Sequence, residues 1–437
     1  MSEISFIHLS DIHFHKLSGN SVDIDTDLRN AILTDIEYNA KDSIKNIQGI
    51  LVGGDIAFAG QKQEYDHAKE FLKKMTEVLG IDEKSIYCVP GNHDVSQQVS
   101  KECISVYTAQ CNIDSAQTLD QAEAILQKHI TDTASPNLLF KTLEGYNEFA
   151  AAYGCNIDSE NPFWTTCFTL DCGMKLKIRG MNSCIISNQD DHKEKDKIRY
   201  MFINQSQIPS YEKDVIWMGL CHHPVEFWKF FQDVKGKLDK RVEIQLYGHK
   251  HEQTVDKNND RLLISAGATH PTRGRDWNPR YNWISFECVR LPENKDRYIE
   301  VKTYPRVLST DRDRFVKDRA NCDQEKPYFI YRLNVDKKRR ESLCDRNQYI
   351  ESVDDQKKIG SCDLIVDGIK KEITYNFFEL SYVQQSEILA NLDLLKEEYE
   401  GRRYINVIRE ILDDAKNKEC LAKFYEMVKE KAKCRRN

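Results

Sequence analysis

Residues 4–13 of the chain read ISFIHLSDIH. Ile4–Leu9 is a short apolar run rich in β-branched side chains, and Asp11 and His13 follow it after a single serine. A run of this length between polar stretches is typical of a buried strand in a layered α/β fold. The segment therefore predicts a strand whose carboxyl end delivers a carboxylate and an imidazole to one place.

The same arrangement recurs four more times in the first 251 residues. Each time a short apolar run ends and a group of Asp, Asn or His residues follows it: Gly54-Asp55 after Ile47–Val52, Gly91-Asn92-His93-Asp94 after Ile86–Val89, His222-His223-Pro224 after Val215–Cys221, and Gly248-His249-Lys250-His251 after Val242–Tyr247. In open α/β sheets the loops that leave the carboxyl ends of strands converge on one crevice, where ligands bind. We therefore expect the five groups to meet in one site.

The side chains in these groups indicate metal ions. Carboxylate, amide and imidazole donors without cysteine suit borderline first-row ions such as manganese, iron or zinc, of which we favour manganese. The groups contain more candidate ligands than one ion with an open position needs, but they suit two ions about 3.5–4 Å apart that share a carboxylate. Such a pair binds phosphoryl oxygens and holds a bridging hydroxide as the nucleophile.

Taken together, the five groups resemble the calcineurin-like metallophosphoesterase superfamily, whose pattern is D-x-H, G-D, G-N-H-D/E, H-x-P and G-H-x-H. All five occur in order between Asp11 and His251, and the resemblance covers about 300 of the 437 residues. It implies an α/β fold built as an α/β/β/α sandwich of two mixed sheets. It also implies two divalent metal ions and the hydrolysis of a phosphoester.

Carried over position by position, the resemblance implies a role for each residue. One ion would be held by Asp11, His13 and His251, the other by Asn92, His222 and His249, with Asp55 bridging the two. His93 would protonate the leaving oxygen or stabilise the transition state, and Asp94 would orient its ring. His223 would lie near the substrate.

Other polar residues near the expected crevice are candidates for substrate binding. Residues 269–275 (THPTRGR) follow a strand predicted at Leu262–Ser265. His270 is one candidate there, and Arg273 and Arg275 could grip a phosphate in a bidentate way, the alternative being a solvated loop. His8 is different: on the first strand, it is expected to be a hydrogen-bonded core histidine.

The motifs also narrow the substrate. Serine/threonine protein phosphatases carry a longer, arginine-bearing second block and G-N-H-E, whereas this chain has Gly53-Gly54-Asp55-Ile56 and ends its third block in Asp94. The stretch around Asp11 looks like the branch of cyclic-nucleotide phosphodiesterases and repair nucleases. We therefore expect a nucleotide-type phosphodiester, including a cyclic nucleotide, as the substrate. Two alternatives stay open: a nuclease acting as an effector in a bacterial defence or conflict system, and a signalling adaptor that binds a ligand without turnover.

The domain organisation follows from changes in composition. We expect a catalytic domain at 1–305 with a helical insertion at about 96–153, a linker at 306–372 that could be partly ordered, and a helical module at 373–437. Apolar residues at helical spacing indicate helices near Ile405–Ala415 and Leu421–Ala432. The module loosely resembles small death-like adaptor modules, which in bacterial conflict systems are fused to nucleases, proteases and phosphoesterases. That resemblance implies a protein partner.

Composition argues against several classes of protein. The chain has 63 basic and 70 acidic residues, so its net charge of −7 provides no global field for nucleic acid or acidic membranes. No apolar run approaches the roughly 20 residues of a membrane span. The 14 cysteines include no C-x-x-C pair and the N-terminus shows no secretory signal, so we expect a cytoplasmic protein with reduced cysteines and no membrane contact.

Overall fold

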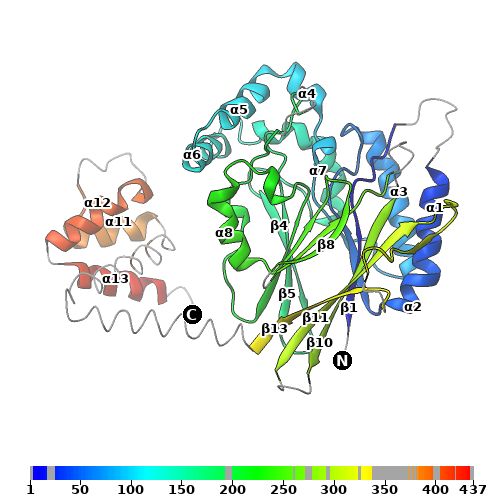
Figure 1. Ribbon diagram of the computed structural model, residues 1–437. Helices are drawn as coiled ribbons and strands as arrows, with labels where there is room; N and C mark the ends of the chain where they lie inside the picture. Colours follow the sequence, from blue (N-terminus) through cyan, green and yellow to red (C-terminus); the bar gives the residue numbers. More distant parts are fainter. Residues whose placement is uncertain are drawn as a thin grey trace. The chain divides into compact units, whose positions relative to one another are not determined.

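The computed structural model describes residues 3–16, 25–191, 199–258, 261–270, 278–291, 296–322, 326–336, 373, 377, 380, 382–396, 404–418 and 420–433. The chain divides into two compact units, Met1–Arg339 and Arg340–Asn437. Two β-sheets with covering helices form the first unit, and the described part of the second unit is helical (Figure 1).

The first sheet carries three of the five motif loops. Its strand order is β12-β11-β10-β1-β2-β3, and β13 also pairs with β11. Three strands run parallel: β1 (Ile4–Leu9), β2 (Ile47–Val52) and β3 (Ile86–Cys88). Antiparallel pairing extends the sheet from β1 through β10 (Arg280–Arg290), β11 (Arg297–Leu308), β12 (Phe315–Lys317) and β13 (Phe329–Asn334).

The second sheet carries the other two motif loops. Its order is β4-β5-β6-β7-β9-β8. The central strands are parallel: β5 (Lys175–Met181), β6 (Val215–Cys221), β7 (Ile244–Tyr247) and β9 (Arg261–Ala266). The edges are antiparallel, with β4 (Phe163–Thr169) and β8 (Gln253–Asn258). Every motif therefore leaves the carboxyl end of a parallel strand.

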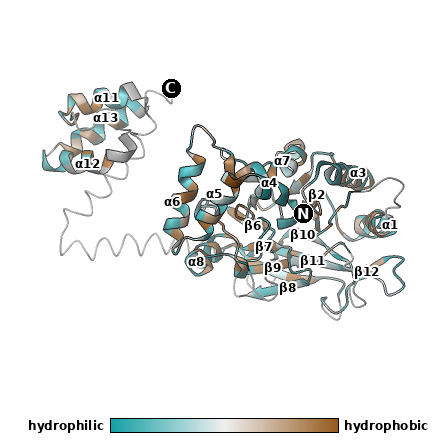
Figure 2. Ribbon diagram, turned by 90° about the horizontal axis from the view of Figure 1, so that it is seen from above, coloured by the Kyte–Doolittle hydropathy of each residue, from teal (hydrophilic) through white to brown (hydrophobic). Residues whose placement is uncertain are grey.

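The two sheets pack face to face. Phe6 of β1 lies edge-on to Phe168 of β4 with ring centroids 5.1 Å apart, and Tyr87 of β3 contacts the same ring at 5.8 Å. Helices α1 (Thr26–Asp35) and α3 (Lys62–Leu79) cover one side of the sheets and α8 (Phe231–Arg241) the other (Figures 1 and 2). This arrangement confirms the predicted sandwich of two mixed sheets.

A buried ion pair joins a covering helix to the first sheet. Asp35, at the end of α1, accepts hydrogen bonds from the Nε of Arg306 on β11 (2.9 Å) and from the hydroxyl of Tyr281 on β10 (2.5 Å). The guanidinium of Arg306 also lies over the ring of Trp283, 4.4 Å from its centroid. After Asp35 the helix continues as a π-helical turn (Ile36–Ala40) and α2 (Lys41–Ser43). The pair therefore fixes the angle at which α1 covers the sheet.

The predicted helical insertion is present between β3 and β4. It comprises α4 (Gln97–Glu102), α5 (Ile104–Asp114), α6 (Leu119–Ile130), η3 (Leu138–Leu143), α7 (Glu144–Ala150) and η4 (Ala151–Tyr153). Tyr146 of α7 anchors it to the first sheet, because its hydroxyl donates to the carbonyl of Cys88 at 2.9 Å.

Three strands differ from the sequence-based description. β12 and β13 pair with β11, so Phe315–Lys317 and Phe329–Asn334, which we assigned to the linker, belong to the sheet of the first unit. β8, at the edge of the second sheet, was not expected. The remainder of the predicted linker, 337–372, lies outside the described residues.

The second unit contains the three predicted helices: α11 (Tyr382–Asn391), α12 (Tyr404–Asn417) and α13 (Leu421–Lys433). Its own apolar core includes Ile388, Ile411 and Phe424, all fully buried, and Phe377 meets Phe424 edge-on at 5.5 Å. Within the described ranges, no helix combines the length and apolarity that crossing a membrane requires.

Candidate metal centre

The first two motif loops are joined by backbone hydrogen bonds. The amides of Asp11 and His13 donate to the carbonyls of Gly54 and Asp55, each at 3.0 Å, and the amide of Phe14 donates to that of Ile56 at 2.8 Å. These bonds extend the pairing of β1 with β2 beyond the ends of both strands. Asp11, His13 and Asp55 are therefore held on one rigid backbone.

Five of the predicted ligands have a left-handed backbone, which non-glycine residues rarely adopt. Their φ angles are 52° for Asp11, 51° for His13, 51° for Asp55, 66° for His249 and 59° for His251. Ten non-glycine residues in the described part of the chain have a positive φ, so half of them are predicted ligands. Strain of this kind persists only where the surroundings enforce it, and it concentrates at functional sites.

Three glycines leave room for the ligand side chains. A Cβ on Gly91 would lie 2.8 Å from the Cγ of Asp55, and one on Gly248 would lie 2.8 Å from the Oδ2 of Asp11. A Cβ on Gly54, whose φ is +97°, would lie 2.7 Å from the Nδ1 of His222. The motif glycines are therefore required by close approach to the acidic and imidazole groups.

The predicted ligands gather on both sides of Asp55. On one side, ligand atoms of Asp11, His13 and His251 lie within 4.8 Å of one another, with 3.2 Å between the Nε2 of His251 and the Oδ1 of Asp11. The Oδ2 of Asp55 lies 3.8 Å from the Nε2 of His13 and 3.3 Å from the Nε2 of His222. Asp55, only 1% exposed, is thus placed between the two halves of the site.

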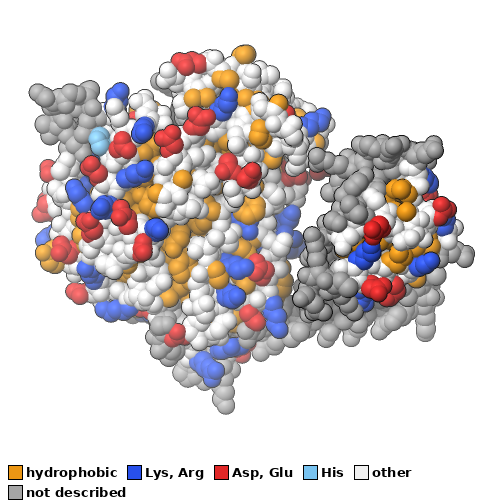
Figure 3. Space-filling model, turned by 180° about the vertical axis from the view of Figure 1, so that it is seen from behind, with side chains coloured by type: hydrophobic (Ala, Val, Ile, Leu, Met, Phe, Trp, Pro, Cys, Tyr) orange, Lys and Arg blue, Asp and Glu red, His pale blue; other side chains and the backbone are white. Residues whose placement is uncertain are grey.

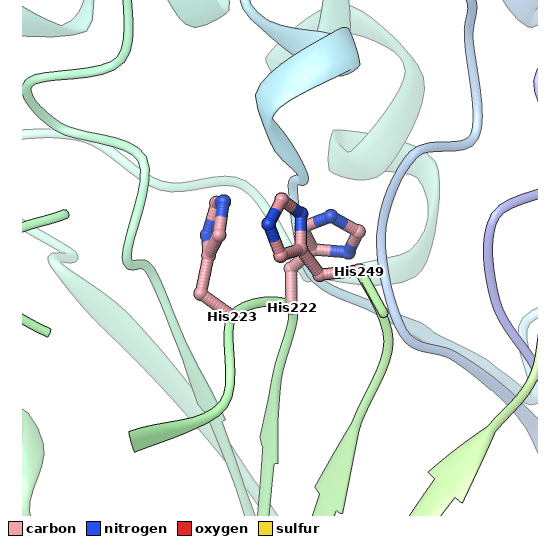
Figure 4. A group of neighbouring side chains, drawn as sticks. All are labelled: His222, His223 and His249. Atoms are coloured by element: carbon pink, nitrogen blue, oxygen red, sulfur yellow. The ribbon is translucent and has the colours of Figure 1, made fainter. Parts of the chain in front are cut away.

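The other half contains three histidines from the second sheet, shown in Figure 4. His222 and His223 follow β6 and His249 follows β7; the ring centroids of His222 and His249 are 5.4 Å apart. The Nδ1 of His222 lies 2.8 Å from the carbonyl of Gly53. Because a carbonyl only accepts, Nδ1 is the protonated donor in this contact, and Nε2 is the ring nitrogen that faces Asp55.

Among the described residues, several buried polar atoms of the motif loops have no hydrogen-bond partner, and two of them are important here. One is the Oδ1 of Asn92, a residue that is 5% exposed, and the other is the Nε2 of fully buried His223. The Nδ1 of His223 lies 2.8 Å from the hydroxyl of Ser183. Buried polar atoms are normally satisfied, so these two are suited to bind a positively charged or hydrogen-bond-donating group. Together with the donor types, they fit divalent cations.

Burial and the nearby carboxylates shift the pKa values of the site histidines in opposite directions. Burial disfavours a charged His222, but attraction by Asp55 and Asp11 outweighs it and raises the pKa of His222 to about 9. Burial lowers the pKa of His13 and of His249 to about 4. Near neutral pH these two rings are therefore uncharged, which is the form that binds a metal ion.

His93 and Asp94 are neighbours in the third motif loop, and both make hydrogen bonds to the second motif loop. Its carboxylate accepts hydrogen bonds from the amides of Ala57 and Gly91, each at 2.9 Å, and from the hydroxyl of Tyr65 at 2.9 Å. The Nδ1 of His93 instead lies 2.8 Å from the carbonyl of Phe58. The carbonyl of Phe58 therefore helps to orient the His93 ring, and the hydrogen bonds of Asp94 hold the second and third motif loops together.

Burial, followed by the charge of Asp55, raises the pKa of Asp94 to about 6. Its amide and hydroxyl donors favour the charged form and partly offset that shift. Neither Phe58 nor Ser183 was predicted to take part in the site. One acts through a main-chain carbonyl and the other belongs to no motif, so the sequence contained no signal for either.

The structure describes only some of the remaining predicted substrate-binding residues. The amides of Thr269 and His270 donate to the carbonyls of Ser10 and Asp11, both at 3.0 Å, and the His270 ring centroid lies 5.8 Å from that of His13. His270 is thus at the edge of the site. Arg273 and Arg275 lie outside the described residues.

His8 lies outside the ligand set, on the same face of β1 as Phe6, between the sheets. It is fully buried, and neither ring nitrogen has a hydrogen-bond partner among the described residues. Burial lowers its pKa to about 3, so the ring is neutral. Within the described part of the chain, the hydrogen bonds expected of a core histidine are therefore absent.

Three known proteins that are similar to this chain share little sequence identity with it. The metallophosphoesterase-like protein YydB of Bacillus subtilis is 22% identical over 261 residues; the match covers 58% of this chain and 50% of YydB, so the chain spans about half the length of that curated relative. Vacuolar Protein Sorting 29 of Cryptosporidium parvum is 11% identical, covering 76% of this chain and 98% of that one, with a TM-score of 0.31. GAP50 of Plasmodium is 13% identical, covering 76% and 89%, with a TM-score of 0.36.

Two families match separate parts of the chain. The GTPase-associated adaptor domain matches residues 369–430, in agreement with the adaptor-like reading of the helical module. The calcineurin-like phosphoesterase family matches residues 4–253, which is more than half of the chain and contains all five motifs. Sequence, strand order and the gathered motif residues agree, and the chain belongs to the calcineurin-like phosphoesterase family.

Proposed function

We propose that this protein is a metal-dependent phosphoesterase that hydrolyses phosphodiester bonds of a nucleotide-type substrate. The observation that carries the proposal is the position of Asp55, a buried carboxylate with an aspartate and two histidines on one side and further histidines on the other. Bound divalent cations, for which we favour manganese, would supply charge stabilisation at the phosphoryl oxygens and lower the pKa of the attacking water.

The geometry supports a division of the ligands into two sets. Asp11, His13 and His251 would hold one ion, and Asn92, His222 and His249 the other, with Asp55 shared. The 3.2 Å bond from the amide of His249 to the Oδ2 of Asp11 links the two sets through the backbone. His223 borders the second set, and its free Nε2 makes it a candidate for contact with the substrate.

His93 is the proposed proton donor to the leaving oxygen. Its Nδ1 must donate to the carbonyl of Phe58, so Nε2 is the atom that can hold or release a proton. The amide of His93 also donates to the Oδ1 of Asp55 at 2.8 Å, which fixes the ring beside the shared carboxylate. The His93 and His13 ring centroids are 4.6 Å apart, so the donor lies next to the first ligand set.

The distribution of charge favours a nucleotide over a long nucleic acid as the substrate. The chain carries a net charge of −7, and on the face in Figure 3 the basic and acidic side chains of the described residues are intermixed rather than gathered in a basic band. Proteins that track a duplex neutralise many phosphates with Lys and Arg. Local metal ions, in contrast, can offset a few phosphate charges in an acidic protein.

The test is hydrolysis of bis(p-nitrophenyl) phosphate by protein stripped of metal and then supplied separately with manganese, iron or zinc. We expect activity that depends on added metal, and we expect Asp55→Asn to abolish it. Asp42→Asn is the matched control, because Asp42 is exposed on α2 and belongs to none of the five motifs. Inactivity of the wild type with every metal would rule the enzyme proposal out in favour of a ligand-binding adaptor.

A second candidate function is a nuclease effector recruited through the helical module, and the adaptor-domain match at 369–430 favours it. We propose that this module binds a protein partner, and that the protein acts in the cytoplasm without membrane contact. To distinguish a nuclease from a nucleotide phosphodiesterase, the metal-loaded protein is tested for degradation of DNA or RNA and for turnover of cyclic and linear nucleotides. Deleting 373–437 should leave hydrolysis intact and abolish partner binding; if hydrolysis is lost, the module is part of the catalytic unit.

A further inference from the structure

Phe58 is an exposed aromatic side chain on an otherwise buried loop. Its side chain is 45% exposed, whereas Asp55, Ile56 and Ala57 immediately before it are at most 1% exposed. Few large apolar side chains are exposed in the described part of the chain, and Phe58 is the one among them that contacts the metal centre. Its ring centroid is 5.4 Å from that of His93 and 6.3 Å from that of His13.

The backbone holds this ring in place. The amide of Phe58 donates to the carbonyl of Phe14 at 3.0 Å, and its own carbonyl accepts from His93. The next turn is fixed by Glu64, whose carboxylate accepts from the amides of Ala59 (2.9 Å) and Gln61 (3.0 Å). Because both main-chain groups of Phe58 are bonded within the site, its side chain is positioned as firmly as the predicted ligands.

His15 widens the exposed surface. Its ring centroid lies 4.2 Å from that of Phe58, with 35° between the ring planes, and its side chain is exposed. His93 lies on another side of Phe58 at 40°. The three rings form a continuous aromatic surface, His15-Phe58-His93, that begins at the proposed proton donor and leads out to solvent.

We infer that Phe58, with His15 beside it, is the surface on which the flat base of a nucleotide substrate stacks. The inference rests on the proposed function and deepens it, because it identifies which residue recognises the nucleoside part. A phosphate bound beside His93 would place the attached sugar and base over the exposed ring. Every base has a π-face, so the stacking is expected to tolerate different bases.

The test compares two phosphodiesters with the same p-nitrophenol leaving group in the manganese-loaded full chain: the p-nitrophenyl ester of thymidine 5′-monophosphate and methyl p-nitrophenyl phosphate. Any contact of the nitrophenyl ring is common to both, so the ratio of their kcat/KM values reports the nucleoside alone. We expect Phe58→Ala to lower this ratio about 5- to 150-fold, mainly through KM of the nucleotide ester. Phe58→Trp should keep the ratio and Phe58→Leu should not, because leucine is apolar but offers no flat face.

Two controls separate this inference from a structural effect. Tyr38→Ala removes another exposed aromatic ring, 65% exposed and on the π-helical turn after α1, and should change neither ester. Phe227→Ala removes a ring 4.8 Å from His249 in the other half of the site. The inference would be overturned if the ratio of the two kcat/KM values in Phe58→Ala stayed within twofold of the wild-type ratio. A fall of the ratio in Phe227→Ala instead would also overturn it.

A binding measurement keeps the inference testable without turnover. Calorimetric titration of the manganese-loaded chain with thymidine 5′-monophosphate and with inorganic phosphate gives the same comparison for product-like ligands. Phe58→Ala should weaken the nucleotide much more than phosphate, and equal weakening of both contradicts stacking. A further outcome is that the wild type hydrolyses neither ester while Phe58→Ala still loses affinity for the nucleotide much more than for phosphate. That result would contradict the proposed activity and support the base-stacking surface.

Discussion

Replacing Gly91 with alanine is a test of how closely the third motif loop must approach Asp55. Gly91 has φ −105° and ψ −178°, a conformation that alanine adopts without strain. The substitution therefore acts through its added methyl group alone. That methyl would lie 2.8 Å from the Cγ of Asp55 and closer still to its Oδ1 and amide nitrogen.

The size of the effect follows from that distance. Carbon atoms in contact prefer about 3.5–4.0 Å, so the Asp55 carboxylate and the third loop must separate by roughly 1 Å. A displacement of 1 Å at a reacting centre costs about 100-fold in rate. Overpacking a tight interior costs about 1–3 kcal/mol of folding free energy. We therefore expect Gly91→Ala to fold, to bind manganese at least tenfold more weakly, and to lose about 99% of its activity.

The assay measures manganese affinity by calorimetry, hydrolysis of bis(p-nitrophenyl) phosphate, and urea unfolding of the same preparations. Gly236→Ala is the matched control, because a Cβ on Gly236, in α8, meets nothing within 4 Å. There alanine should stabilise the protein by about 0.5–1 kcal/mol and leave hydrolysis unchanged. If Gly91→Ala retains half of the wild-type activity, the close packing of the third loop against Asp55 is not required.

Three further predictions concern pH and packing. First, the raised pKa of His222 contributes folding stability that is complete below pH 6.5 and is lost as the pH rises through about 9. The free energy of unfolding of the metal-free protein should therefore fall by up to about 3 kcal/mol across that window, while its manganese affinity rises. Urea unfolding in chelator at each pH checks this, and a free energy of unfolding that does not change with pH contradicts it. Second, His8→Leu should raise the free energy of unfolding by about 1 kcal/mol, because it removes two buried ring nitrogens that have no partner among the described residues; a loss of more than 1 kcal/mol in urea unfolding would show that the ring is satisfied. Third, Arg306→Met should cost about 3–5 kcal/mol by leaving the buried charge of Asp35 unpaired; a thermal-unfolding change worth less than 1 kcal/mol would refute the role of the pair.

The central strands were predictable because each is a short apolar run with a motif at its end. Ile4–Leu9, Ile47–Val52 and Val215–Cys221 have the predicted bounds in the structure. β8 (Gln253–Asn258) was missed because its sequence, QTVDKN, is polar, as an edge strand next to solvent permits. β12 has only three residues, and its pairing with β11 depends on tertiary contact rather than on any local pattern.

The gathering of the site residues was predictable from their position at strand ends, but their mutual orientation was not. Asp94 follows His93 directly, so the sequence suggested that its carboxylate serves that ring. In the structure its oxygens are satisfied by amides of the second motif loop, more than 30 residues earlier in the chain. The ring of His93 contacts the main-chain carbonyl of Phe58. Because every residue has such a carbonyl, no sequence pattern indicates this contact.

Titration of metal-free protein with manganese, followed by hydrolysis of bis(p-nitrophenyl) phosphate, tests the central claim most directly. If two ions share Asp55, activity should rise to a plateau at two equivalents of metal per chain. A plateau at one equivalent would contradict the shared-carboxylate centre, and no activity at any ratio would contradict the proposed hydrolysis.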